Sequence, residues 1–128
     1  NKPSALQLAG AVGQIKRGLE FIHECSIIHR DVKPANVLYH APSHFKVADF
    51  GIAMHLKVGN YTTEPGGSRE YMSPARREGR PYSHNSDFWS LGLIIRQTLP
   101  PEPVASTDAA WNSLRGVANE LIAMEDAS

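Results

Sequence analysis

The sequence lacks the features that mark several large classes of protein. Its single cysteine, Cys25, excludes an internal disulfide and a thiolate metal cage. It favours a reducing compartment, so we expect a cytoplasmic protein. No apolar run approaches the roughly 18 residues that span a bilayer, and no signal peptide is recognisable. The 13 basic residues balance 13 acidic residues, which excludes a polyanion-binding tail. We therefore expect neither nucleic acid nor a membrane as a partner.

What the sequence does contain is enough apolar material for one folded domain. Of its 128 residues, 41% are apolar, and a chain of this length buries roughly two-thirds of the surface that it exposes when unfolded. The chain opens with Asn1 rather than Met, which suggests a fragment or a processed product. These properties exclude classes of protein without indicating a function.

The spacing of apolar residues predicts three helices. Apolar side chains recur at steps of three and four from Ala5 to Ile22, and Ser4 stands in the place of an N-cap. Similar patterns over residues 88–99 and 114–124 predict two further helices.

The middle of the chain predicts a short hairpin and a long loop. Runs of strand-forming residues at 36–39 and 45–48 flank the turn-rich residues 40–44. Residues 51–82 hold five glycines and three prolines without a sustained period, which predicts an irregular segment. The predicted fold class is therefore α+β and mainly α-helical, with one β-hairpin and one long loop.

One loop gathers side chains that suit phosphate chemistry. Between the first predicted helix and the hairpin, the sequence reads His29-Arg30-Asp31-Val32-Lys33-Pro34-Ala35-Asn36. Asp31 is able to accept a hydroxyl proton, and Lys33 is able to neutralise charge on a phosphate. Asn36 offers an oxygen to a hard cation such as Mg²⁺.

A second acidic motif, Asp49-Phe50-Gly51, begins 18 residues after Asp31, at the far end of the predicted hairpin. We expect the Asp49 carboxylate to face the same site as Asp31 across the turn, and Gly51 allows the backbone to swing. Either motif alone is common in solvated turns. The two together, at this spacing and in this order of elements, predict a shared site.

Together these motifs resemble the C-terminal lobe of a eukaryotic protein kinase. The family order also includes the later run Ser86-Asp87-Phe88-Trp89-Ser90-Leu91-Gly92. Lys33 is typical of serine/threonine kinases, and the run Tyr71-Met72-Ser73-Pro74 is most similar to MAP kinase kinases. The resemblance implies that residues 1–128 form a partial protein kinase domain in which the N-terminal lobe is absent.

The resemblance implies a role for each residue of the two motifs. Asp31 would be the base that orients the substrate hydroxyl, and Lys33 would steady the transferred phosphoryl group. Asn36 and Asp49 would hold Mg²⁺ that bridges the phosphates of ATP. Leu38 would form a hydrophobic floor under the adenine. The implied ATP-binding residues are therefore Lys33, Asn36, Leu38 and Asp49.

Four further residues would support this site. His29 and Phe50 would stack as part of an internal spine, and Gly51 completes the metal-binding motif. Asp87, at the start of a buried helix, would accept hydrogen bonds from backbone N–H groups of the loop that carries Asp31.

Residues 52–70 of the long loop correspond to the activation segment of the family. Thr62 and Thr63 lie where family members are phosphorylated, with Tyr61 and Ser68 as weaker candidates. A phosphate adds a charge of about −1.5 to −2. Arg30, directly before the base, would be its partner and belongs to the implied catalytic set. An upstream kinase is the implied activator.

Three departures from the family pattern change these expectations. The glycine-rich phosphate loop and the strand lysine of the N-terminal lobe do not occur in the chain, so we expect the chain by itself to be inactive. Ala75 stands where the family has a glutamate that pairs with a buried arginine, so we expect a looser activation segment. Residues 100–110 leave little room for the helix that docks substrates.

The leading hypothesis is a serine/threonine protein kinase that uses ATP and Mg²⁺ to phosphorylate a protein substrate. The alternative is a non-catalytic kinase-like module, or pseudokinase, that binds partners or acts as a scaffold. A small-molecule phosphotransferase is disfavoured by Lys33 and by the long activation segment. We interpret Arg76, Arg77 and Arg80, which Glu78 interrupts, as a solvated face rather than as a site for acidic substrates.

Overall fold

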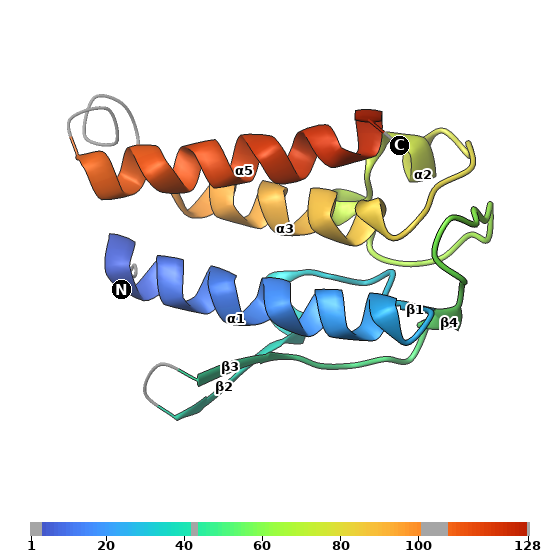
Figure 1. The fold of residues 1–128 in the computed structure, drawn as a ribbon, viewed down its shortest axis with the longest axis horizontal. Coiled ribbons are helices and arrows are strands. Elements are labelled where there is room, and N and C mark those ends of the chain that lie inside the picture. Colours follow the sequence, from blue (N-terminus) through green and yellow to red (C-terminus); the bar gives the residue numbers. More distant parts are fainter. Residues whose placement is uncertain (1–3, 42–43, 101–107, 128) are drawn as a thin grey trace.

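A computed structural model describes residues 4–41, 44–100 and 108–127. Three long helices lie side by side in it: α1 (Ala5–Glu24), α3 (Asn85–Thr98) and α5 (Ala109–Ala127). The helix α3 lies between the other two, and a β-hairpin covers the opposite side of α1 (Figure 1). The irregular segments gather at one end of the helices, where α1 ends and α3 begins.

The start of α1 follows directly from its local sequence. The Gln7 N–H donates to the Ser4 hydroxyl at 3.1 Å, and the Ser4 N–H donates to the Gln7 side chain at 2.9 Å. This reciprocal pair satisfies two N–H groups that a helix start otherwise leaves without partners. The predicted N-cap is confirmed. The apolar face of α1 turns into the core through Leu8, Val12, Ile15 and Leu19.

The core forms where the three helices meet. Its fully buried members come from each helix: Leu19, Leu91, Ile95, Ala118 and Leu121. Gly92 lets α3 and α5 approach closely, because a Cβ there would lie 2.7 Å from Ile122 Cγ1 and 2.9 Å from the Ala118 carbonyl oxygen. A side chain at position 92 would therefore push the two helices apart.

The predicted hairpin is confirmed, with β2 (Val37–Ala41) paired antiparallel to β3 (His44–Val47). The Phe45 N–H donates to the Gln14 side chain at 2.8 Å, which ties the hairpin to α1. A second small sheet joins β1 (Ile27–Ile28) to β4 (Met54–His55). This sheet fastens the chain after α1 to the start of the long loop.

The predicted loop is largely irregular and contains only short elements: β4, the 3-10 turn η2 (Arg69–Tyr71) and the helix α2 (Pro74–Arg77). The backbones of Thr62 and Tyr82 pair across it in an isolated bridge. The predicted fold class, α+β and mainly helical, is confirmed. The helix α3 begins three residues and α5 five residues before the predicted starts.

Two further observations bound the fold. The prediction that no substrate-docking helix separates α3 from α5 falls mainly on residues 101–107, outside the described residues. No described helix is long and apolar enough to cross a bilayer.

Candidate active site

The loop that carries Asp31 is held in place by a buried carboxylate on α3. Asp87, 1% exposed, accepts hydrogen bonds from the backbone N–H groups of His29 at 2.9 Å and Arg30 at 3.0 Å. Its Oδ2 also lies 2.8 Å from Nε2 of His23, near the end of α1. The two contacts with backbone N–H groups are the ones that the resemblance implies for Asp87. They hold Arg30 in a left-handed conformation, φ +73°, which costs on the order of 1 kcal/mol.

His29 links this loop to the segment before Asp49. The Asp31 N–H donates to Nδ1 of His29 at 3.0 Å, so Nδ1 carries no proton. Nε2 of His29 therefore carries the proton and donates to the Ala48 carbonyl at 2.8 Å. The Ala48 N–H in turn donates to the Asn36 carbonyl at 2.7 Å. Both backbone polar groups of Ala48, the carbonyl and the N–H, are therefore bound to the loop that carries Asp31.

Three polar side chains, those of Asn36, Ser68 and Lys33, converge on Asp31. Nδ2 of Asn36 lies 3.2 Å from Asp31 Oδ2 and 2.7 Å from the Asp31 carbonyl oxygen. Ser68 donates to Asp31 Oδ1 twice, from its N–H at 3.2 Å and from its hydroxyl at 3.0 Å. Nζ of Lys33 donates to the Ser68 hydroxyl at 2.6 Å and lies 3.9 Å from Asp31 Oδ2. Asp31, Lys33 and Asn36, predicted to act together, do lie together.

The environment of Asp31 keeps its carboxyl group ionised. Burial works to raise the pKa of Asp31, but the Ser68 hydroxyl, the Lys33 charge, the Ser68 N–H and the Asn36 amide together hold this pKa below its ordinary value. A carboxylate with a lowered pKa is a weak base. Asp31 is therefore suited to orienting a hydroxyl and to taking its proton late, when the hydroxyl has become acidic.

The Asp49 carboxylate makes a local contact within its own motif. Asp49 is exposed, has φ +55°, and accepts a hydrogen bond from the Gly51 N–H at 3.1 Å. Among the described residues, no hydrogen bond joins its carboxylate to Asp31 or Asn36. Its backbone, by contrast, follows directly on Ala48 and so lies next to Asn36. A Cβ on residue 51 would lie 3.0 Å from Asp49 Oδ1, so glycine leaves room for this carboxylate.

The residues present suit Mg²⁺ held jointly with a phosphate ligand. Asn36 and Asp49 offer only hard oxygen ligands, which Mg²⁺ prefers. In the described parts of the chain, no three His, Cys, Asp or Glu side chains are grouped closely enough to hold a metal ion by themselves. Mg²⁺ commonly takes one or two protein ligands and completes its shell with phosphate oxygens and water. The donor set therefore fits a magnesium–nucleotide complex better than a free metal ion.

The two apolar side chains predicted for the site, Leu38 and Phe50, are exposed at the surface of the protein. The rings of His29 and Phe50 are in contact, as the resemblance implies; they lie 4.8 Å apart at 66° in an edge-on arrangement. Leu38 is 54% and Phe50 45% exposed. The role of Leu38 under an adenine stays a prediction.

Arg30 contacts the activation segment through backbone carbonyls. Its Nε donates to Ile52 at 2.9 Å, and its Nη1 donates to Pro65 at 3.1 Å. Thr62 is held by its backbone bridge to Tyr82, whereas Thr63 is exposed. The structure therefore brings Arg30 to the segment that carries both threonines without joining it to either hydroxyl. Their phosphorylation stays a prediction.

The interpretation of the arginines after the segment as a solvated face holds for Arg77 and Arg80, which are exposed, but was wrong for Arg76, which is half-buried. Nη1 of Arg76 donates to the Arg30 carbonyl at 2.8 Å, and its guanidinium lies 5.0 Å from the centre of the Tyr82 ring. Arg77 donates to two carbonyls of η2. Arg80 is exposed and pairs with Glu78. Arg76 and Arg77 thus fasten the chain to itself.

Two residues of this region were missed or misjudged in the sequence. Ser68 was considered only as a weak phosphorylation candidate, yet it contacts both Asp31 and Lys33. Glu125, on α5, accepts a hydrogen bond from the Ala75 N–H at 3.1 Å, so a carboxylate does reach the end of the activation segment. No local spacing signals either contact, because 37 and 50 residues separate the partners.

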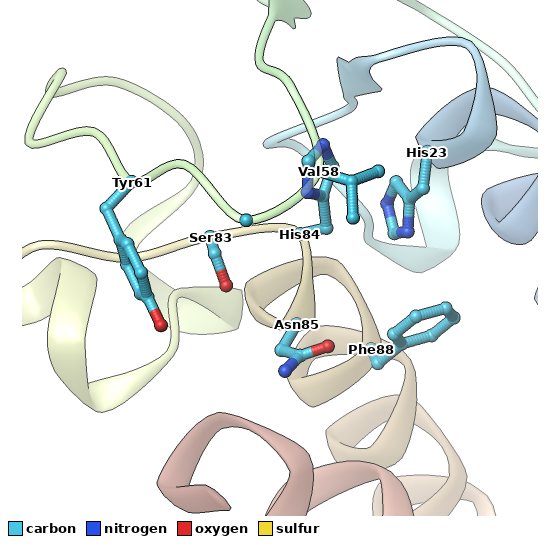
Figure 2. A pocket seen from close by; sticks show the side chains of 8 residues that line it. His23, Val58, Tyr61, Ser83, His84, Asn85 and Phe88 are labelled. Atoms are coloured by element: carbon cyan, nitrogen blue, oxygen red, sulfur yellow. The ribbon is translucent and has the colours of Figure 1, made fainter. Parts of the chain in front are cut away.

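A separate cavity of about 240 Å³ lies between the end of α1, the chain after β4 and the start of α3 (Figure 2). None of the predicted catalytic, metal-binding or ATP-binding residues lines it; the lining residues are His23, Val58, Gly59, Tyr61, Ser83, His84, Asn85 and Phe88. The rings of His23 and His84 lie 4.8 Å apart at its edge. The candidate active site is therefore distinct from this cavity.

Comparison with known proteins agrees with the geometry of the loop. A family model described as the protein kinase domain matches residues 4–126. The chain is similar to the MAP kinase kinase MKK1/SSP32 of Saccharomyces cerevisiae, with 44% identity over 63% of the chain and 16% of that protein. It is also similar to mitogen-activated protein kinase kinase 1c of Physcomitrium patens, with 38% identity over 83% of the chain and 32% of that protein.

Serine/threonine-protein kinase fused of Drosophila melanogaster is 37% identical over 71% of the chain and 11% of that protein. The chain thus spans at most about a third of the length of these relatives. The match of the family model over nearly all of its residues shows that the chain belongs to the protein kinase domain family.

Proposed function

We propose that the chain supplies the catalytic loop and the magnesium ligands of an ATP-dependent serine/threonine protein kinase. The observation that carries this proposal is the convergence of Lys33, Asn36 and Ser68 on the carboxylate of Asp31. The family of the chain and the names of its relatives support the same activity.

In this function Asp31 orients the hydroxyl of the protein substrate and accepts its proton as the new bond to phosphorus forms. Lys33, whose Nζ lies 3.9 Å from Asp31 Oδ2, stabilises the negative charge of the transferred group. Asp87 contributes indirectly, because it fixes the backbone on which Asp31 is mounted. Positioning of this kind contributes about 7–11 kcal/mol to lowering a barrier.

Asn36 and Asp49 would hold Mg²⁺, and Leu38 would contact the adenine. When bound, ATP would supply the phosphoryl group, and the Mg²⁺ ion would neutralise the negative charge that develops on it. The Asp49 carboxylate accepts from the Gly51 N–H through Oδ1 only, which leaves Oδ2 for the ion.

The partners follow from the same proposal. We propose a protein substrate, and an upstream kinase that acts on Thr62 and Thr63. The single, exposed Cys25 supports a cytoplasmic location, which fractionation of cells that contain the protein would check.

Calorimetric titration of the 128-residue chain with ATP tests the site directly. We expect weak binding that requires Mg²⁺ and that Asp49→Asn weakens by roughly tenfold or more. Glu20→Gln, which neutralises an exposed carboxylate on α1, serves as the control and should leave binding unchanged. Equal affinity with and without Mg²⁺, or no effect of Asp49→Asn, would contradict the proposal.

The second candidate is a non-catalytic kinase-like module. The exposed apolar side chains of Leu38 and Phe50 favour it, since such surfaces often mark contact sites. A folded chain that binds no nucleotide in the presence of Mg²⁺ would make this candidate the better one.

A further inference from the structure

The helix α2, which follows the activation segment, is held by a carboxylate that lies 50 residues further along the chain. Ala75 lies in the first turn of α2 and is 3% exposed. Its N–H donates to Glu125 Oε1 at 3.1 Å. Figure 1 shows α2 beside the C-terminal end of α5, which carries Glu125. A carboxylate at the start of a helix satisfies an N–H group that the helix itself cannot pair.

The position of Glu125 is fixed by the packing of α5. Nδ2 of Asn85, at the start of α3, donates to the Met124 carbonyl at 3.0 Å. Further along the same two helices, the contact of Gly92 with Ala118 sets their separation. Glu125 therefore extends toward α2 from a part of α5 that is packed and hydrogen-bonded against α3.

The helix α2 is joined in turn to the loop that carries Asp31. Arg76, the residue after Ala75, donates from Nη1 to the Arg30 carbonyl at 2.8 Å and from Nη2 to the Gly66 carbonyl at 2.5 Å. The first carbonyl directly precedes Asp31. The second lies two residues before Ser68. Arg76 thus holds the backbone on both sides of the contact between Asp31 and Ser68.

Gly67 shows how closely these parts fit. Its φ is +97°, and a Cβ there would lie 2.7 Å from the Arg30 carbonyl oxygen and 2.5 Å from Nη2 of Arg76. A side chain at position 67 would therefore displace the Arg30 carbonyl or the Arg76 guanidinium. A shift of α2 away from the loop would break both Arg76 contacts at once.

We propose that Glu125 is a positioning residue. By holding the first turn of α2, it holds Arg76 in place. Arg76 in turn keeps the backbones next to Asp31 and Ser68 close enough for these two residues to hydrogen-bond. This role rests on the proposed function, in which Asp31 orients the substrate hydroxyl. The contact is made to the backbone of Ala75, so it does not depend on the side chain at that position.

The test compares two substitutions of Glu125 by NMR of the ¹⁵N-labelled 128-residue chain. Glu125→Met keeps the length of the side chain but removes the acceptor, whereas Glu125→Gln keeps an acceptor oxygen. For Glu125→Met we expect about tenfold faster hydrogen exchange at the Ala75 N–H. We also expect an upfield shift of the Ser68 amide proton as its hydrogen bond to Asp31 lengthens. Glu125→Gln should restore both signals to nearly their original values.

The same two substitutions at Glu120, which is exposed on α5, serve as matched controls and should change neither signal. A purely structural role would speed exchange at core amides such as that of Leu91 by the same factor, and this result would overturn the proposal. So would an unchanged Ser68 signal in Glu125→Met, or a Glu125→Gln variant that behaves like Glu125→Met.

A second variant covers the case in which Glu125→Met does not fold. Arg76→Lys keeps the charge but cannot donate to the Arg30 and Gly66 carbonyls together. It should shift the Ser68 amide in the same direction, and an unshifted Ser68 amide would overturn the proposal. None of these signals requires a nucleotide. Failure to bind Mg²⁺ and ATP would count against the proposed function alone.

Discussion

Ser68 directs both of its hydrogen-bond donors to one carboxylate oxygen of Asp31. Its N–H lies 3.2 Å and its hydroxyl 3.0 Å from Oδ1. The other oxygen of Asp31 faces Asn36, and Lys33 reaches the same Ser68 hydroxyl. Because Ser68 lies in the long loop, the orientation of the Asp31 carboxylate depends on the order of a distant segment.

Replacing Ser68 by alanine should raise the pKa of Asp31. Burial already works to raise this pKa, and the Ser68 hydroxyl is foremost among the contacts that hold it below its ordinary value of 3.8. Titration of the Asp31 carboxyl carbon by ¹³C NMR, with a metal chelator present, measures the change. Ser113→Ala, at an exposed serine of α5, is the control. An unchanged or lower pKa in Ser68→Ala would show that the hydroxyl does not stabilise the carboxylate.

Removing the Asp87 carboxylate should destabilise the whole chain. Asp87→Ala leaves the buried N–H groups of His29 and Arg30 without their acceptor, and each such group costs about 1–3 kcal/mol. Together with the lost contact to His23, we expect the free energy of unfolding to fall by about 3–5 kcal/mol. Urea denaturation measures this difference, with Glu120→Ala as the surface control. A loss of less than about 1 kcal/mol would contradict the conclusion that Asp87 holds the loop of Asp31 in place.

Two glycine-to-alanine substitutions should have opposite effects. Gly92→Ala places a Cβ 2.7 Å from Ile122, so it should cost about 1–3 kcal/mol through overpacking of α3 against α5. Gly116→Ala lies within α5, where an added Cβ meets nothing within 4 Å, so it should stabilise by about 0.5–1 kcal/mol. Thermal denaturation of the two variants measures the shifts of Tm, which we expect to be negative for Gly92→Ala and positive for Gly116→Ala. Equal shifts of Tm would mean that α3 and α5 are not in close contact at Gly92.

Acidification below pH 6.5 should destabilise the fold through His84. Burial lowers the pKa of His84 from its ordinary value of 6.5, and the neighbouring His23 lowers it further. The Leu56 carbonyl and the Asp87 charge oppose this shift without reversing it. Because the unfolded chain then binds the proton more readily, stability is complete above pH 6.5 and is lost as the pH falls toward the lowered pKa.

The slope of stability against pH separates His84 from other histidines. His84→Gln should flatten the dependence between pH 5 and about 6.5, whereas His55→Gln, at an exposed position of β4, should leave it unchanged. Urea denaturation at several pH values gives the slopes. Identical slopes in the original chain and in His84→Gln would contradict this account.

Elements whose signals are local could be predicted from the sequence. The capping pair of Ser4 and Gln7 lies within four residues, and the hairpin follows from two short runs and a turn. The early start of α5 has a local signal that was missed: Asp108 accepts a hydrogen bond from the Ala110 N–H at 2.8 Å, as an N-cap does. The apolar pattern that was used begins only after this cap.

Contacts between distant segments could not be predicted in this way. The pairing of Ser68 with Asp31 and of Glu125 with Ala75 depends on how the long loop and α5 pack, which no spacing encodes. The family resemblance placed Asp31, Asn36 and Asp87 correctly relative to the loop because these residues share one motif or its direct support.

Paramagnetic mapping with Mn²⁺ and ATP tests most directly whether Asp31, Asn36 and Asp49 surround one metal–nucleotide complex. Mn²⁺ replaces Mg²⁺ at oxygen sites and broadens the NMR signals of nearby nuclei. In the ¹⁵N-labelled chain we expect selective broadening of the amides of Asn36, Asp49 and Gly51, which excess Mg²⁺ reverses. Broadening confined to other parts of the chain, or equal broadening with and without ATP, would contradict the account.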